Sequence, residues 1–248
     1  MTDFSYQLYS SREFPPLEAT LKMLADLGYR EVEGYGGVYN DPKGLREQLD
    51  ANGLKMTSGH FSLDMLESES AKAVDIAGTL GLSAVYCPHV MPDKRPADAA
   101  GWTRFGERLQ KAGEAVVEAG FIFGWHNHDF EFKRLPDGSV PLQRILDGGP
   151  SLKWEADIAW IVRGGGDPIE WIGKFGDRIT AVHVKDIAPA GQNAGEDGWA
   201  DVGHGTMDWK GIWAALRKTP VRTFVMEHDK PADHKRFASR SIAAAKAF

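Results

Sequence analysis

The sequence predicts an α/β protein folded as a (β/α)₈ TIM barrel. Eight short runs rich in apolar and β-branched residues alternate with longer segments whose apolar residues return every three or four positions, as expected for parallel strands joined by crossover helices. The chain has 248 residues, a length at which an α/β barrel can form one domain. We therefore expect residues 1–248 to form a single barrel domain. An open doubly wound sheet is the alternative, but no G-x-G-x-x-G motif follows the first predicted strand.

The predicted strands are short and occur from one end of the chain to the other. In several of them the apolar run ends at a polar residue. The eight strands are predicted at residues 4–9, 30–34, 54–59, 84–88, 121–126, 152–157, 179–185 and 223–227.

Helices are predicted between these strands at residues 16–27, 68–80, 102–119 and 208–218. The first three are followed at once by Gly28, Gly81 and Gly120. A helix often ends at a glycine because the chain there takes a left-handed backbone conformation, which is strained for residues that have a Cβ. Residues 187–207 lack a helical period and contain five glycines. A loop of that length predicts a lid or a binding segment, with a surface connection as the alternative.

Composition excludes several classes of protein. Hydrophobic residues make up 42% of the chain and charged residues 26%, which is ordinary for a globular protein and excludes a disordered chain. The net charge of −6 leaves no basic excess for a nucleic-acid partner. Cys87 is the only cysteine, so neither an internal disulfide nor a thiolate metal cluster is expected. The residues before Tyr9 do not resemble a signal peptide and no run of about 18 apolar residues occurs, so a cytoplasmic protein without a membrane partner is expected.

Polar residues collect where the predicted strands end. In a TIM barrel these ends meet at one mouth, where the chemistry is done. Six of the eight histidines occur at such positions in this reading. The residues concerned are, from the second strand to the eighth, Glu33, His60, His89, His126 and His128, Glu155 and Asp157, His183 and Lys185, and Glu227 and His228. A single histidine at a strand end is more often a hydrogen-bonded structural residue, but so many together predict a functional site.

Residues two apart on a strand point to the same face, so His126 and His128 can share a face, as can Glu155 and Asp157. Imidazole and carboxylate ligands together suit Zn²⁺, Mn²⁺ or Co²⁺ better than Ca²⁺. The sequence therefore predicts one divalent metal ion as cofactor, Mn²⁺, Zn²⁺, Co²⁺ or Mg²⁺.

Several segments resemble one known family over nearly the whole chain. They are residues 6–10 (YQLYS), 27–33 (LGYREVE), 126–132 (HNHDFEF), 177–186 (DRITAVHVKD), 202–209 (VGHGTMDW) and 224–229 (FVMEHD). With these segments the chain resembles the xylose isomerase-like TIM barrels of the sugar phosphate isomerase/epimerase superfamily, which includes inosose dehydratases, hydroxypyruvate isomerases and ketose 3-epimerases.

The resemblance implies a metal site with a Glu, an Asp, a His and a Glu from strands five to eight. The last three fall on Asp157, His183 and Glu227, but the position that holds Glu in the family is His126 here. The predicted metal ligands are thus His126, Asp157, His183 and Glu227, with His128 in place of His126 as the alternative.

The histidine at this position affects the chemistry that the family performs. Its epimerases and isomerases use two opposed Glu residues as bases beside a metal-polarised carbonyl, and a metal-bound imidazole has no lone pair left for a proton. Glu227 is therefore predicted to work with another group, for which His128, Glu155 and Lys185 are the candidates.

Three further residues are predicted to bind substrate: His60, His89 and Glu33. An apolar wall for a sugar ring is the functional role proposed for Trp102, Trp160 and Trp199, with core packing as the alternative. Lys133, Arg134 and Arg163 are candidates for contact with a phosphate, with solvated surface charge as the alternative. The resemblance is compatible with a homo-oligomer.

The predicted function is a metal-dependent isomerase or epimerase of a sugar or keto-sugar that works through an enediolate or enolate. The alternative is a lyase or dehydratase acting on a 3-keto-sugar, a 3-keto-glycoside or an inosose. A non-catalytic sugar-binding barrel is more remote. So is an apurinic endonuclease, because the chain is acidic and Trp160 stands three residues after Asp157, where those enzymes have His.

Overall fold

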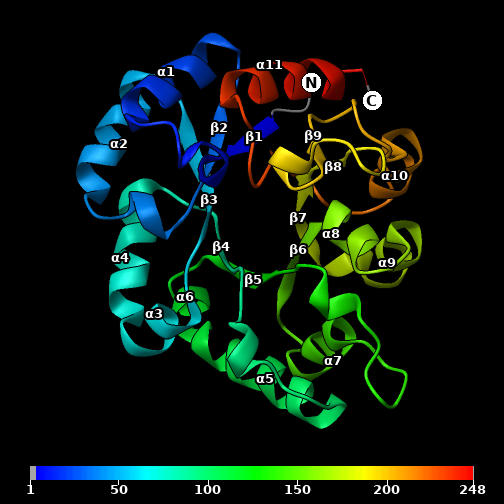
Figure 1. Ribbon diagram of the computed structural model, residues 1–248. Helices are drawn as coiled ribbons and strands as arrows, with labels where there is room; N and C mark the ends of the chain where they lie inside the picture. Colours follow the sequence, from blue (N-terminus) through cyan, green and yellow to red (C-terminus); the bar gives the residue numbers. More distant parts are fainter. Residues whose placement is uncertain (1–3, 248) are drawn as a thin grey trace.

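Residues 4–247 are described in the computed structural model. Eight parallel strands form a closed barrel, surrounded by helices (Figure 1). This confirms the predicted barrel, and each strand lies within two residues of its predicted bounds. Around the barrel, neighbouring strands follow the order β1 (Phe4–Gln7), β10 (Thr223–Met226), β7 (Ile179–Val184), β6 (Lys153–Asp157), β5 (Ile122–His126), β4 (Ala84–Cys87), β3 (Lys55–His60) and β2 (Glu31–Gly34).

Two of the predicted helices are divided in the structure. Residues 68–80 span the end of one helix and the whole of the next, and residues 102–119 are interrupted at Gly113, where a Cβ would collide with the ring of Phe123. The helices are α1 (Leu17–Asp26), α2 (Pro42–Ala51), α3 (Leu63–Ser68), α4 (Ser70–Leu80), α5 (Ala99–Ala112), α6 (Glu114–Glu118), α7 (Pro141–Gly148), α8 (Ile158–Arg163), α9 (Pro168–Phe175), α10 (Trp209–Leu216) and α11 (His234–Ala245).

The predicted glycine caps are confirmed. Gly28, Gly81 and Gly120 have φ of +91°, +76° and +91°, the left-handed region in which any other residue is strained. Each glycine therefore turns the chain from a helix back toward the next strand.

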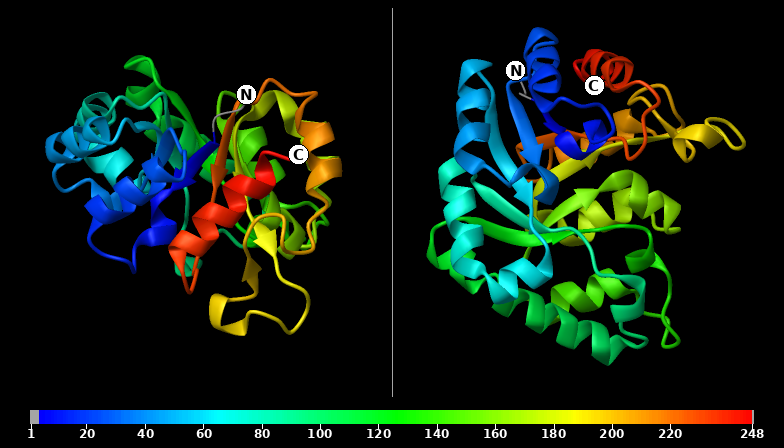
Figure 2. Two further views of the ribbon diagram at one scale, coloured as in Figure 1. Left: turned by 90° about the horizontal axis from the view of Figure 1, so that it is seen from above. Right: turned by 60° about the vertical axis from the view of Figure 1, so that its left-hand side comes forward.

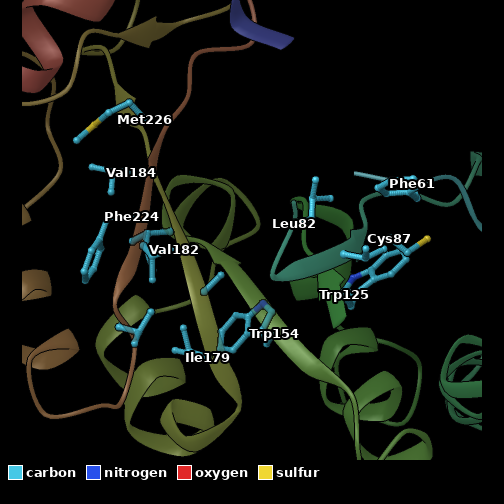
Figure 3. Close-up of a cluster of buried hydrophobic side chains, with 14 of the residues drawn as sticks. Phe61, Leu82, Cys87, Trp125, Trp154, Ile179, Val182, Val184, Phe224 and Met226 are labelled. Carbon is cyan, nitrogen blue, oxygen red and sulfur yellow. The ribbon is translucent and has the colours of Figure 1, made fainter. Parts of the chain in front are cut away.

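The barrel strands are buried on both faces, as is usual for parallel sheets covered by helices. Large apolar side chains such as Trp125, Trp154 and Phe224 lie in the layer between strands and helices (Figure 3). Because side chains alternate along a strand, the residues next to these, including His126 and Glu155, face the inside of the barrel. The apolar packing outside the barrel thus fixes which polar residues face inward.

The segment after β7 is more ordered than predicted. Residues 187–207 were expected to lack regular structure, but β8 (Asp186–Ile187) pairs with β9 (Trp199–Ala200) as an antiparallel ribbon. Strands of two residues are too short to give a periodic sequence pattern. Figure 2 shows this ribbon projecting from one end of the barrel. Within residues 4–247, the model holds no helix of the length and apolarity that a membrane span requires.

Candidate active site

The four predicted metal ligands meet at one end of the barrel. They come from β5, β6, β7 and the residue after β10, which are consecutive neighbours around the barrel. His126, Asp157, His183 and Glu227 each offer one ligand atom, and these atoms all lie within 4.8 Å of one another. The backbone register places Asp157 opposite His183. The geometry therefore allows the predicted ligand set, whose role remains a prediction.

A second group of ligand atoms lies beside the first and shares two of its residues. His60 and Glu155 form it together with His126 and His183, again within 4.8 Å. Glu155 precedes Asp157 by two residues on β6, so it faces the same way from one layer deeper in the barrel.

The imidazole of His183 connects the two groups. Its Nδ1 lies 2.9 Å from Oε2 of Glu227, and its Nε2 lies 2.7 Å from Oε1 of Glu33. Burial alone would lower the pKa of His183, but the surrounding carboxylates of Glu155, Glu227 and Glu33 raise it well above its usual value. The raised pKa favours a protonated imidazole, whose two N–H groups can donate to Glu227 and Glu33.

Glu33 and Glu155 form a layer of buried carboxylates beneath the cavity. Glu33 accepts hydrogen bonds from Gln7 and Ser58, and Oε2 of Glu155 lies 2.6 Å from Nε2 of His60 and 3.0 Å from Nδ1 of His126. Both carboxylates are 0% exposed. Their position does not support the predicted contact of Glu33 with substrate or the predicted proton transfer by Glu155. Each carboxylate lies within hydrogen-bonding distance of imidazoles, Glu155 of His60 and His126 and Glu33 of His183.

Asp157 has one oxygen satisfied and one free. Its Oδ1 accepts the N–H of Trp160 at 2.9 Å and so caps the start of α8, whereas Oδ2 accepts no hydrogen bond and has Lys185 Nζ at 3.6 Å. Burial raises the pKa of Asp157 to about 7, although Lys185 opposes the shift. A buried carboxylate oxygen without a hydrogen bond is costly, so this atom favours a bound cation.

Lys185 is completely buried at the edge of the site. Its Nζ lies 2.6 Å from Oδ2 of Asp229 and 3.1 Å from Oε2 of Glu227, and the rings of Trp160 and Trp199 flank it at 5.0 Å and 4.3 Å. Burial would lower the pKa of Lys185, but the carboxylates raise it. An ammonium with a raised pKa keeps its proton, so the predicted role of Lys185 as a base is not supported.

Sequence reasoning missed Asp229. It stands two residues after Glu227, the same spacing that relates the predicted pairs on β5 and β6, and this spacing was the signal that could have found it. Its carboxylate contributes to the cage around Lys185 and lines the cavity described below.

His126 and His128 are both neutral. Burial lowers the pKa of His126 well below its usual value and that of His128 to about 3, and neighbouring cations add to both shifts. Nδ1 of His128 has no hydrogen-bond partner, and its backbone N–H donates to Glu131. A neutral imidazole with a free nitrogen can bind a metal ion or accept a proton.

A cavity of about 770 Å³ opens over these residues. Of the predicted site residues, those that line it are His60, His89, His126, His128 and Glu227. The remaining members of the site lie behind this surface, so a ligand in the cavity would touch imidazoles and one glutamate first.

The tryptophans of the sequence analysis do not line this cavity. Trp102 packs against Phe105 and Phe130 in the core, and Trp160 and Trp199 contact each other and Lys185. Core packing is therefore the role that the position of Trp102 supports, whereas Trp160 and Trp199 pack around Lys185 beside the site.

The three candidate phosphate ligands also have other partners. Nζ of Lys133 lies 2.6 Å from Asp129, Arg134 donates to the carbonyl of Gly138, and Arg163 donates to the carbonyl of Asp197. None of the three lines the cavity in the described part of the chain. Their predicted contact with a phosphate at this site is not supported.

Comparison with known proteins gives a consistent picture. Residues 21–245 match the family described as xylose isomerase-like TIM barrel. An inosose dehydratase from Lacticaseibacillus casei is 25% identical in an alignment 225 positions long that covers 77% of this chain and 74% of that protein. A sugar phosphate isomerase/epimerase from Parabacteroides distasonis is similar in structure with a TM-score of 0.84 and 22% identity, over 99% of this chain and 94% of the other. The zinc-bound IolI protein has a TM-score of 0.78 and 16% identity, over 100% and 96% of the two chains.

Proposed function

The chain belongs to the xylose isomerase-like TIM barrels, an enzyme family of sugar isomerases, epimerases and dehydratases, and from this premise we propose that it is a metal-dependent lyase acting on a keto-sugar. In the proposed reaction a proton leaves the carbon next to a carbonyl group, and water or an alcohol is eliminated from the neighbouring carbon. The observation that carries the proposal is the convergence of His126, Asp157, His183 and Glu227 within 4.8 Å beside a cavity.

The residues present fit one divalent cation. Two imidazoles and two carboxylates are a donor set that Zn²⁺, Mn²⁺ and Co²⁺ accept, and Oδ2 of Asp157 is a buried acceptor without a hydrogen bond. When bound, such an ion polarises a substrate carbonyl and acidifies the adjacent C–H bond. His126 is the proposed strand-five ligand, because its position rather than that of His128 belongs to the cluster with Asp157.

Glu227 is the proposed proton acceptor. Burial would raise its pKa, but Lys185 and His183 hold it well below its usual value, so the carboxylate is ionised and lines the cavity. Glu227 takes the proton from carbon and then delivers it to the departing oxygen. A C–H and a C–O bond break, an O–H bond forms, and a carbon–carbon double bond conjugated with the carbonyl remains. One carboxylate is sufficient for this sequence.

Elimination suits this set of groups better than epimerisation. Epimerisation returns the proton to the opposite face of the carbon, for which the family uses a second glutamate, and this chain has His126 there. An imidazole that is a metal ligand has no lone pair free for a proton. The reaction proposed here needs no second base.

Epimerisation or isomerisation is the second candidate because of His128. Its imidazole is neutral, lines the cavity and has an unpartnered Nδ1, so it could exchange a proton on the other face of the substrate.

The test is incubation of the metal-loaded protein with an inosose and with a 3-keto-glucoside in D₂O. A lyase exchanges or removes the α-proton and produces an enone that absorbs in the ultraviolet, together with water or free alcohol. Glu227→Gln should abolish both the loss or exchange of the α-proton and the formation of the enone. Asp75→Asn, an exposed residue of α4, is the matched control and should retain them. Deuterium uptake with a new diastereomer but no enone would replace the proposal with epimerisation, and the absence of both deuterium uptake and enone would overturn both.

A further inference from the structure

The cavity extends beyond the polar residues to an apolar side. We call this side the outer wall. It is formed by residues that follow the first four barrel strands, β1 to β4, whereas Glu227 and His126 approach from β10 and β5. The outer wall consists of Tyr9, Tyr35, Leu63, Val90 and Met91.

Two side chains of the outer wall are exposed. Met91 is 55% exposed and Tyr9 is 37% exposed, and the rings of Tyr9 and Tyr35 meet edge to face with centroids 5.3 Å apart. Single exposed apolar side chains are common, but these converge on the cavity that holds Glu227. An apolar surface with a few convergent polar groups is the usual composition of a small-molecule site.

The cations around the cavity already have partners. Arg108 donates two hydrogen bonds to Glu67, and Lys94 lies 3.8 Å from Asp64. The guanidinium of Arg12 donates to the backbone carbonyls of Tyr9 and Asp229. The residues that line the cavity also include four carboxylates, Asp64, Asp197, Glu227 and Asp229. These carboxylates also have cationic partners, Lys94 for Asp64, Lys230 for Asp197, and Lys185 for Glu227 and Asp229. Among the described residues, the lining therefore offers a phosphate or carboxylate on the substrate no cation without a partner.

The size of the cavity favours a substrate larger than a single sugar ring. At about 770 Å³ it lies in the upper part of the range of about 300–1,000 Å³ in which sites for drug-sized ligands fall. A site of that size has room for a group attached to a sugar ring at Glu227, and the outer wall is the apolar part of its lining.

We propose that the outer wall is a subsite for the uncharged, apolar aglycone of a glycoside whose oxidised sugar ring lies at His126 and Glu227. This inference rests on the proposed function and names its substrate class. In a 3-keto-glycoside, loss of the C2 proton to Glu227 and cleavage of the C1–O bond leave a C1–C2 double bond. The aglycone then departs as an alcohol or phenol, carrying the proton that Glu227 received.

Binding measurements test the subsite without turnover. Methyl and phenyl glucosides and galactosides, which carry no keto group, are titrated calorimetrically into the metal-loaded protein. We expect the phenyl compound of at least one sugar to bind about tenfold or more tightly than the methyl compound, because the ring covers apolar side chains. In Met91→Ser this preference should fall about fivefold while affinity for the methyl glycoside stays the same.

Val117→Ser is the matched control, because Val117 is a 57% exposed apolar residue of α6 outside the cavity. It should keep the full preference for the phenyl compound. Equal binding of methyl and phenyl glycosides, binding of neither, or an unchanged preference in Met91→Ser overturns the subsite. Conversion of a keto-sugar without any phenyl preference would remove the subsite and leave the proposed reaction standing. Phenyl-selective binding without conversion of the keto-glycoside would overturn the proposed reaction and leave the subsite standing.

Discussion

The position and charge of each residue in this site depend on the side chains around it as well as on its own type. The sequence predicts which face of each strand a side chain occupies, because the alternation of polar and apolar residues is local. The sequence does not predict how far below the surface of the cavity a side chain lies. Glu33 and Glu155 were expected at the surface of the site, yet other side chains cover them, since His60 and His126 lie between these carboxylates and the cavity. Which residue covers which depends on strand register and on distant parts of the chain.

A buried carboxyl outside the predicted ligand set gives a prediction that needs no metal. Glu131 is 0% exposed and accepts hydrogen bonds from the indole of Trp125 and the backbone N–H of His128, both at 2.9 Å. Burial raises the pKa of Glu131 from 4.5 to about 8, against the effect of these hydrogen bonds. Between about pH 4.5 and 8 the folded protein keeps a proton that the unfolded chain has released.

The stability due to this group is therefore complete at low pH and is lost as the pH rises toward 8, by at most about 1.4 kcal/mol per pH unit. Glu131→Gln carries no titrating group. Its free energy of unfolding relative to the parent should increase steadily from pH 5 to pH 8 in urea titrations of the chelated protein. Glu114→Gln, an exposed residue at the start of α6, should show no such trend. A difference that is constant with pH would contradict the prediction.

At the scale of elements, the strands could be predicted and the connections only in part. Apolar runs flanked by glycines identify the barrel strands, because both faces of a parallel strand are buried. The close approach of Phe123 to Gly113, which leaves no room for a Cβ where α5 ends, could not be predicted, since Phe123 lies on a later strand. The β8–β9 ribbon is held by a contact across some 20 residues, which no local pattern contains.

The carboxylate of Asp186 makes this contact. It accepts backbone hydrogen bonds from Ile187 and Gly203 at 2.9 Å and from Met207 at 3.1 Å, and so joins both ends of the 187–207 segment. Asp186→Ala leaves three donors without this acceptor, at a cost of about 1–3 kcal/mol for each donor that stays buried. We expect the segment to open locally, with faster amide exchange and new proteolytic cleavage within residues 188–206. Far-ultraviolet circular dichroism should show an intact barrel.

Asp208→Ala is the matched control for this experiment. Asp208 also accepts a backbone hydrogen bond, from Gly211, but it caps α10 and does not join the ends of the segment. Cleavage confined to the segment in Asp186→Ala and absent from Asp208→Ala supports the assignment. Equal cleavage in both variants would contradict it.

For the whole molecule, the proposed metal site connects barrel strands that are far apart in sequence. Its four ligands stand on or directly after β5, β6, β7 and β10, which follow one another around the barrel and span residues 122–227. The unfolded chain cannot hold these groups together, so a bound cation stabilises the folded barrel alone. The closed barrel could be predicted from the strand count, and the cluster followed from the family resemblance. The cage around Lys185 followed from neither, since Trp199 lies on the unpredicted strand β9 and Asp229 in the loop after β10.

A cation at 100 times its dissociation constant stabilises the folded state by about 2.7 kcal/mol, which for a chain of this size raises the melting temperature by roughly 5–10 °C. We expect this rise when Zn²⁺ or Mn²⁺ is added to chelated protein at pH 8, where Asp157 with its pKa of about 7 is ionised. Asp157→Asn keeps an oxygen to cap α8 but loses the negative ligand, so most of the rise should disappear. Asp167→Asn, which alters the N-cap of α9 outside the site, should retain it. An equal rise in both variants would mean that the cation binds elsewhere, because within residues 4–247 Oδ2 of Asp157 is the only buried carboxylate oxygen of the cluster with Glu227 that has no hydrogen bond.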